Sequence, residues 1–314
     1  MTTDLSGFVS EVGRADYLAA YDRVLVDLWP VSTESILIES RFGTTHAIAS
    51  GPVDAPPLML LHAAGLSATQ WYPNIADFAH DFRVYAPDSI FDSGGGRQTR
   101  EMHGREDCAR WLGDVLDGLG IDQAPFVGLS QGAWLAASAA RFIPDRVTRA
   151  AVLAPAATLR PMRLPVLLLL RLRPFLPKKE PLAETRKTFR TVFGGRYMPD
   201  ERYVAQVALG AQHFRYQKPP IFPTVFPDQD LRRIAAPTLL LVAAHEVMYN
   251  PGRALERARL LVPDLEAEVV PDAGHFVSME QAEIVDRRVL EFLGVDRHGR
   301  EPEEPSPGHI QRTS

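Results

Sequence analysis

Short apolar runs alternate along most of this chain with stretches of helical spacing, and this alternation is the strongest constraint on its fold. One run, PPLMLLHAAG, is continuous and closed by Gly65, which is typical of a strand buried on both faces. Stretches such as REDCARWLGDVLDGLG, stopped by Gly120, predict the helices between the runs. Strands that alternate with helices form a mostly parallel sheet covered on both sides, so the sequence predicts an α/β fold. The other runs predicted as strands are FRVYAPDS, APFVGLS, VTRAAVLAPAA, APTLLLVAAHE and LEAEVVPDAGH.

Other segments precede, interrupt or follow this alternation. Apolar residues at helical spacing from Tyr17 to Trp29 predict a leading helix, and residues 34–51 alternate like a pair of strands. Residues 157–235 contain many prolines and aromatic residues without a buried-strand pattern, so we expect a mainly helical cap inserted into a core of residues 1–156 and 236–296. The polar, proline-rich residues 297–314 are expected to be a disordered tail.

The composition argues against several kinds of partner. Of the 314 residues, 46% are hydrophobic and 23% charged, and a net charge of -5 leaves no basic surplus for nucleic acid or an anionic membrane. The most apolar stretch, LPVLLLLRLRPFLP, is too short to span a bilayer. A single cysteine, Cys108, and an opening segment without a basic region before an apolar one predict a cytoplasmic protein rather than a secreted one.

The segment VGLSQGAW places Ser130 where a predicted strand meets a predicted helix. A chain that reverses at one residue strains that residue and brings the strand and helix backbones together, so Gly128 and Gly132 supply neighbours without side chains. Such a turn holds the Ser130 hydroxyl above the carboxyl edge of the sheet, beside the amide of Gln131 at the helix N-terminus. We interpret Ser130 as a nucleophile rather than part of an ordinary glycine-rich loop.

A serine nucleophile needs a base and an acid that orients the base, in the chain order serine, acid, histidine. His275 directly follows the last predicted strand, and Glu246 follows the strand before it. Both therefore lie at carboxyl ends of strands, where an open parallel sheet assembles its site. Asp272 and His245 are the second choices for acid and base.

The loop after the first buried strand, LLHAAGLS, is expected to complete an oxyanion hole. Two backbone amides must face the developing negative charge. The amide of Gln131 is one, and that of Ala64 is the expected second. His62, in the same loop, is interpreted as a buried imidazole that ties the loop to its neighbours.

These residues resemble the α/β-hydrolase superfamily. LLHAAGLSATQWYPNIADFAHDFRVYAPD, VGLSQG, AAHEVMYNP and PDAGHFVSMEQ are most similar to the bacterial carboxylesterase group that includes the naproxen-type esterases. The resemblance implies an α/β-hydrolase fold with a helical cap and an esterase that needs neither metal nor organic cofactor. It also implies the roles already assigned to Ser130, His275, Glu246, Ala64 and Gln131.

The predicted function is hydrolysis of a carboxylic ester of a lipophilic small molecule, provided that the apolar side chains of the insertion line the pocket instead of packing the insertion on the core. One alternative is a cyclase, lyase or thioesterase acting on a bulky intermediate of specialised metabolism. Another is a hydrolase-like receptor that binds a ligand without catalysis. Epoxide hydrolases and haloalkane dehalogenases are disfavoured, because they have aspartate in place of Ser130. The apolar residues in question are Leu167 to Leu170, Phe175, Phe189, Phe193, Phe214, Phe222 and Phe226.

Overall fold

The apolar runs form one sheet in the computed structural model, which describes residues 5–172 and 180–295. Its strands are β2 (Glu34–Ser40), β3 (Gly43–Ser50), β4 (Pro57–Leu61), β5 (Arg83–Pro87), β6 (Arg97–Gln98), β7 (Ala124–Leu129), β8 (Val147–Leu153), β10 (Thr238–Ala243) and β11 (Leu265–Val270). Their order is β11-β10-β8-β7-β4-β5-β3-β2, with β6 beside β3. The pairs from β11 to β5 are parallel, and only the pairs made by β3 are antiparallel among these strands. The predicted mostly parallel sheet is confirmed.

Burial explains why the central strands are continuous apolar runs. Leu58, Met59 and Leu60 of β4 have no exposed surface, and every residue of β10 is buried. Such strands are covered on both faces and have no solvent side on which a polar residue would be favourable. The edge strand β2 instead mixes exposed and buried positions, as a strand with one wet face does.

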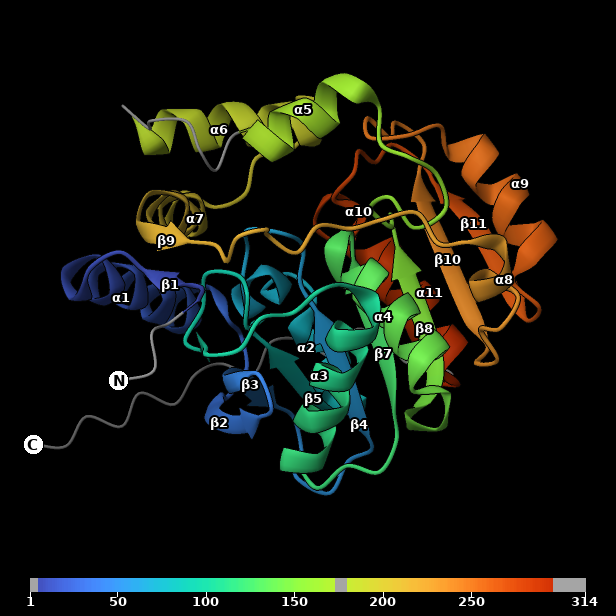
Figure 1. Cartoon of the computed structure of the whole chain (residues 1–314), viewed down its shortest axis with the longest axis horizontal. Coiled ribbons are helices and arrows are strands. Elements are labelled where there is room, and N and C mark those ends of the chain that lie inside the picture. Colours follow the sequence, from blue (N-terminus) through green and yellow to red (C-terminus); the bar gives the residue numbers. More distant parts are fainter. Residues whose placement is uncertain (1–4, 173–179, 296–314) are drawn as a thin grey trace, which may run out of the picture.

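Helices cover both faces of the sheet (Figure 1). They are α2 (Ile75–Asp81), α3 (Arg105–Gly118), α4 (Gln131–Phe142), α9 (Pro251–Leu261) and α11 (Ala282–Leu293). Helix α4 packs on β4, β7 and β8 and against α3, whereas α2 and α11 pack together and contact β5 and β10. Helix α3 ends just before Gly120, whose φ of 69° allows the chain to turn away. Short turns η1 (Ala68–Trp71), η2 (Pro144–Arg146), α8 (Asp228–Leu231) and α10 (Val277–Glu280) lie in the connections.

The segment between β8 and β10 contributes mainly helices. These are α5 (Leu164–Leu172), α6 (Pro181–Val192) and α7 (Glu201–His213), followed by the two-residue strand β9 (Phe214–Arg215). Helices α5 and α6 lie beyond the carboxyl ends of the parallel strands, and α7 lies between α6 and the leading helix (Figure 1). This segment therefore lies over the carboxyl edge of the sheet, where the sequence predicts the site.

The leading helix α1 (Glu11–Leu28) begins earlier than the predicted start at Tyr17. Ser10 caps it by accepting a hydrogen bond from the Gly13 amide at 3.1 Å. A Cβ at Gly13 would lie 2.7 Å from the ring of His213, so only glycine allows α1 to approach α7 this closely. Strand β1 (Gly7–Phe8) also pairs with β9, and the N-terminal segment therefore supports the helices above the sheet.

Candidate active site

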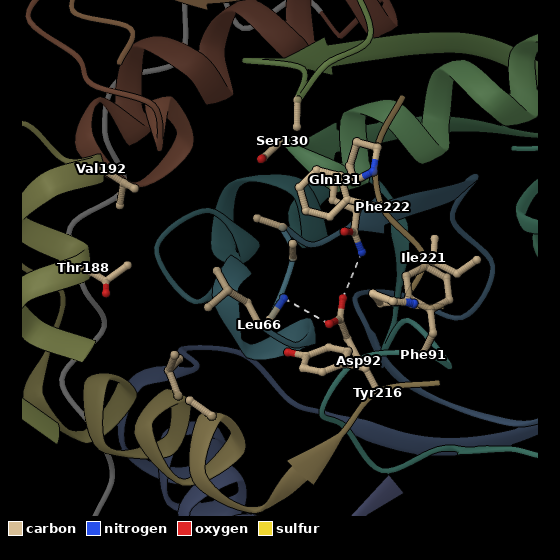
Figure 2. Close-up of a pocket in the computed structure, with 18 of the residues that line it drawn as sticks. Leu66, Phe91, Asp92, Ser130, Gln131, Thr188, Val192, Tyr216, Ile221 and Phe222 are labelled. Atoms are coloured by element: carbon tan, nitrogen blue, oxygen red, sulfur yellow. Dashed lines mark hydrogen bonds between the residues drawn. The ribbon is translucent and has the colours of Figure 1, made fainter. Parts of the chain in front are cut away.

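Ser130 occupies the turn between β7 and α4 with strained dihedral angles, φ 57° and ψ -108°. This conformation is rare for a residue with a side chain and persists only where the surroundings fix it. Here the Ser130 amide donates to the Leu153 carbonyl at 2.9 Å, and the Ser130 carbonyl accepts from the amides of Trp134 and Ala156. The side chain of Ser130 is directed into the cavity shown in Figure 2.

The two glycines that flank Ser130 lie where three backbones meet. A Cβ at Gly132 would be 2.0 Å from the Leu61 carbonyl oxygen, and one at Gly128 would be 2.2 Å from the carbonyl oxygen of Gly132. These separations are far below van der Waals contact, and the obstructing atoms are backbone rather than flexible side chains. The packing of β4, β7 and α4 therefore requires glycine at both positions.

His275 and Glu246 extend from neighbouring strand ends toward Ser130. The Oγ of Ser130 lies 2.8 Å from Nε2 of His275, and Nδ1 of His275 lies 3.0 and 2.9 Å from the two carboxylate oxygens of Glu246. An ionised carboxylate only accepts hydrogen bonds, so it places the imidazole proton on Nδ1 and leaves Nε2 to accept from the serine hydroxyl. All three residues are buried, and Glu246 also accepts from the Met248 amide at 2.8 Å.

The second-choice residues lie away from this arrangement. Asp272 is exposed, in a turn with φ 50°, and His245 is also exposed. The backbone of His245 serves the loop structure, because its amide donates to the Ala273 carbonyl at 2.9 Å. Neither side chain is brought to Ser130.

A carboxylate that sequence reasoning missed holds the loop of His275. Glu280 accepts hydrogen bonds from the amides of Gly274 at 2.8 Å and Phe276 at 3.2 Å, on either side of the histidine. The His275 amide itself donates to the Val192 carbonyl at the end of α6, at 3.1 Å. Burial raises the pKa of Glu280, although both amide hydrogen bonds oppose the shift. Its place in the segment PDAGHFVSMEQ was the available signal.

The loop after β4 is held by side chains on both sides. Nδ1 of His62 donates to the Ala63 carbonyl and Nε2 accepts from the Ser89 amide, both at 2.8 Å. Burial lowers the pKa of His62 and favours this neutral form. The Ala63 amide donates to Oε1 of Gln70 at 2.8 Å. The predicted structural role of His62 is confirmed.

The backbone amides of Ala64 and Gln131 differ from those of Ala63 and Gly65, which both donate hydrogen bonds. In the described part of the chain, neither the Ala64 amide nor the Gln131 amide has a hydrogen-bond acceptor. Both residues line the cavity next to Ser130, and Gln131 is the first residue of α4, where helix amides have no partner within the helix.

The cavity in front of Ser130 has a volume of about 440 Å³. Ser130 and Gln131 lie at one side of it, and Thr188 and Val192 of α6 lie across from them (Figure 2). Most of the wall is apolar, and none of the described residues that form it is lysine or arginine. Its apolar lining includes Leu66, Phe91, Met162, Phe189, Val192, Val207, Ile221, Phe222, Met248 and Phe276.

Of the apolar residues named for the insertion, some line the cavity and others pack elsewhere in the protein. Phe189 and Phe222 line the cavity, whereas Phe193 and Phe226 are fully buried away from it. Phe214 packs its ring against Phe8, and Leu167 and Leu168 are not part of the cavity wall. Phe175, the side chains of Leu169 and Leu170, and the tail 297–314 lie outside what the structure describes.

The cavity wall also contains a carboxyl group that was not predicted. Asp92 follows β5 and is 5% exposed. Its two oxygens accept from the Gly65 amide at 3.1 Å and from Nε2 of Gln131 at 2.9 Å. Burial raises the pKa of Asp92 to about 7, assisted by the charge of Asp88. Its position after the carboxyl end of a parallel strand was the signal that could have identified it.

Among residues 5–172 and 180–295, no group of histidine, cysteine, aspartate or glutamate side chains is arranged to hold a metal ion. No helix in the same part of the chain has the length and apolar character needed to cross a bilayer.

The sequence and the fold of this chain are similar to those of known proteins. The family model described as "Alpha/beta hydrolase family" matches residues 58–287. The chain is 40% identical over 290 residues to the uncharacterized carboxylesterase nap of Bacillus subtilis, covering 89% of this chain and 93% of that protein. It is 37% identical to carboxylesterase YbfK of the same organism, over 93% and 98% of the two chains. The crystal structure of naproxen esterase from Bacillus subtilis matches with a TM-score of 0.83 at 39% identity, covering 91% of this chain and all of that one.

Proposed function

This chain belongs to the α/β-hydrolase family and is an esterase-type hydrolase, and on that premise we propose that it cleaves esters of lipophilic small molecules through an acyl intermediate on Ser130. The observation that carries the proposal is the continuous set of short contacts from Ser130 through His275 to Glu246. A serine, a base and an acid in this geometry form the machinery of nucleophilic acyl transfer.

In the proposed reaction His275 moves one proton in each half. Nε2 of His275 takes the Ser130 proton as Oγ attacks the ester carbonyl, and Glu246 stabilises the imidazolium. The same proton then passes to the leaving alkoxide as the bond between acyl carbon and alcohol oxygen breaks, which leaves an acyl-serine. Water, deprotonated by His275, then attacks the acyl carbon. The bond between the acyl carbon and Oγ breaks as His275 returns the proton to Oγ, which releases the carboxylic acid and the free serine.

The tetrahedral oxyanion would be held by the amides of Ala64 and Gln131. Both border the cavity beside Ser130, and the N-terminus of α4 adds a favourable dipole at this point. Each donor of this kind lowers a barrier by roughly 3 kcal/mol. Neither step requires a metal or an organic cofactor.

The apolar cavity wall supports a lipophilic and uncharged substrate. Residues 157–235 would act as a cap on the core of residues 1–156 and 236–296, because Phe189 and Val192 of α6 close the cavity opposite Ser130. A carboxylate on the substrate would be desolvated there without a lysine or arginine in the described wall, which is strongly unfavourable.

Covalent labelling tests the serine intermediate. Intact-mass measurement after treatment with a fluorophosphonate should show one adduct on the wild type and none on Ser130→Ala, which should also lose turnover of 4-nitrophenyl butanoate. Ser138→Ala is the matched control, because Ser138 lies in α4, the helix that follows Ser130, and its Oγ donates to the Trp134 carbonyl at 2.7 Å. Absence of an adduct on folded wild type would instead favour the cyclase, lyase or receptor alternatives.

A second assay tests the substrate class. The mono-4-nitrophenyl ester of succinic acid matches the butanoate in acyl length but adds a carboxylate. We expect its kcat/KM to be at least about 100-fold lower, because the charge must leave water on entering the cavity. Equal kcat/KM values for the two esters would contradict a lipophilic preference.

A further inference from the structure

Asp92 connects the two segments that carry the proposed oxyanion donors. One carboxyl oxygen accepts from the amide of Gly65, the residue after Ala64, at 3.1 Å. The other accepts from the side-chain Nε2 of Gln131 at 2.9 Å. Both bonds are drawn in Figure 2, where the Asp92 carboxyl lies between the loop and the start of α4. The backbone amide of the same Gln131 is the second proposed donor.

The loop that carries Asp92 is itself fixed. The Asp92 amide donates to the Ser89 carbonyl at 2.8 Å, and the Ser93 carbonyl accepts from the hydroxyl of Tyr17 at 2.9 Å. A Cβ at Gly94 would lie 2.5 Å from the side chain of Asp88, so the chain here passes too close for any other residue. These contacts hold Asp92 in place, so its carboxyl can fix the positions of Gly65 and the Gln131 side chain.

The bonds of the loop after β4 leave one amide directed elsewhere. The Ala63 amide is taken by Gln70, and the Gly65 amide is taken by Asp92. The Ala64 amide lies between them, and its residue lines the cavity. Gly65 has φ 70°, a conformation that glycine adopts without strain and that the bond to Asp92 helps to hold. The orientation of the Ala64 amide therefore depends on its two anchored neighbours.

The geometry points to Asp92 as a positioning residue for the oxyanion hole: its carboxyl ties the loop of Ala64 to the side chain of Gln131 and so fixes the separation of the two donor amides. The inference rests on the proposed ester hydrolysis at Ser130. Asp92 is not assigned a contact with the reacting atoms. It acts through Gly65 and Gln131, which it holds in place.

The electrostatic environment is compatible with this role. A full negative charge beside a developing oxyanion would oppose the reaction. Burial raises the pKa of Asp92 to about 7, so the carboxyl is protonated in a substantial fraction of molecules at neutral pH. The bridge, rather than the charge, is the feature that the reaction would use.

Substitutions separate the bridge from the charge. Asp92→Ala removes the bridge and should lower kcat by about 10- to 100-fold, since small displacements of such groups weaken transition-state stabilisation. KM for 4-nitrophenyl butanoate should change less than threefold. Asp92→Asn should keep kcat within about fivefold, because an amide can accept from Gly65 and donate to the Gln131 side chain once that side chain turns over.

Gln131→Ala gives an independent route to the same loss. It removes the side chain that Asp92 holds but keeps the backbone amide of residue 131. We expect a fall in kcat similar to that of Asp92→Ala. The kcat of the double variant should be at most about twofold lower than that of the slower single variant, because the two substitutions remove the same contact. Phenylboronic acid forms a tetrahedral adduct with serine. Its inhibition should weaken in parallel with kcat in Asp92→Ala, in Gln131→Ala and in the double variant.

The outcomes distinguish this inference from its premise. Equal damage from Asp92→Asn and Asp92→Ala, or a rise in KM with kcat unchanged, would overturn the positioning role and indicate charge or substrate contact instead. Additive effects of Asp92→Ala and Gln131→Ala would overturn it as well. Turnover retained by Ser130→Ala would instead contradict the proposed function itself, whatever the Asp92 variants do. Thermal unfolding of each variant shows whether its protein is folded at the assay temperature.

Discussion

Both carboxylate oxygens of Glu246 lie within 3.0 Å of a single nitrogen of His275, Nδ1. This contact sets the tautomer, because a carboxylate cannot donate a hydrogen bond back. In Glu246→Gln the amide can donate to Nδ1 and place the imidazole proton on Nε2, where it cannot accept from Ser130. We expect kcat for 4-nitrophenyl butanoate to fall by about 10³- to 10⁴-fold with the fold intact.

Asp272→Asn is the control for this experiment. Asp272 is exposed and has φ 50°, which asparagine tolerates. Its kcat should stay within about twofold of the wild type, since surface substitutions away from special features have small effects. A greater loss from Asp272→Asn than from Glu246→Gln would show that the acid has been assigned to the wrong carboxylate.

Gly132→Ala should prevent the native fold or lower the free energy of unfolding by more than about 4 kcal/mol. A Cβ that overlaps backbone atoms cannot be accommodated by moving a flexible side chain. The added Cβ would meet the Leu61 carbonyl oxygen at 2.0 Å. Gly113→Ala is the matched glycine in a neighbouring helix, where the nearest atom to a Cβ is 3.9 Å away. That variant should be stabilised by up to about 1 kcal/mol in urea unfolding. Equal stability of the two variants would refute the close approach at Gly132.

Glu280→Gln should lower kcat by about tenfold. Its carboxylate accepts from the amides on both sides of His275, and a neutral amide side chain presents only one oxygen to these two donors. The free energy of unfolding should fall by about 1 to 3 kcal/mol, as expected for a buried donor left without its partner. Glu283→Gln, at an exposed position in α11, should match the wild type in both measurements. Unchanged kcat in Glu280→Gln would mean that the loop of His275 is held without this carboxylate.

The stability contributed by His62 should decline in acid. Burial lowers the pKa of His62 in the folded state, so the unfolded chain binds the proton more readily. This contribution is fully present above the pKa of histidine in the unfolded chain, about 6.5, and is lost as the pH falls below that value. His62→Gln, which cannot titrate, should be less stable than the wild type by about 1 to 3 kcal/mol at pH 7. Urea unfolding at pH 7 and pH 5 should show this gap narrowing, and a constant or widening gap would contradict the expected sign.

The alternation of strands and helices was readable from the sequence because β4 and β10 are buried on both faces and leave no position for a polar residue. Ser130 could be located for a similar reason, since two glycines marked the tight turn. Chain order and strand ends then selected Glu246 and His275, which the structure brings within hydrogen-bond distance of each other, with His275 also within hydrogen-bond distance of Ser130.

Glu280 lies only four and six residues from the amides that it accepts from, but residue type alone does not show that its side chain folds back onto the loop of His275. Asp92 was not predicted because its role depends on contacts between distant segments. Asp92 bonds to Gly65 and Gln131, and nothing in its own neighbourhood shows that these residues converge on it. The early start of α1 was missed for a related reason. Gly13 disfavours a helix in isolation but is required for the approach to His213.

The pairing of β1 with β9 sets an order of events during synthesis. Phe8 lies opposite Phe214, so β1 cannot pair with β9 until roughly 200 further residues have been synthesised. At typical rates of translation this interval is about 10 to 40 s. Strand β1 can thus reach its final place only after the three helices above the sheet, α5, α6 and α7, have been synthesised.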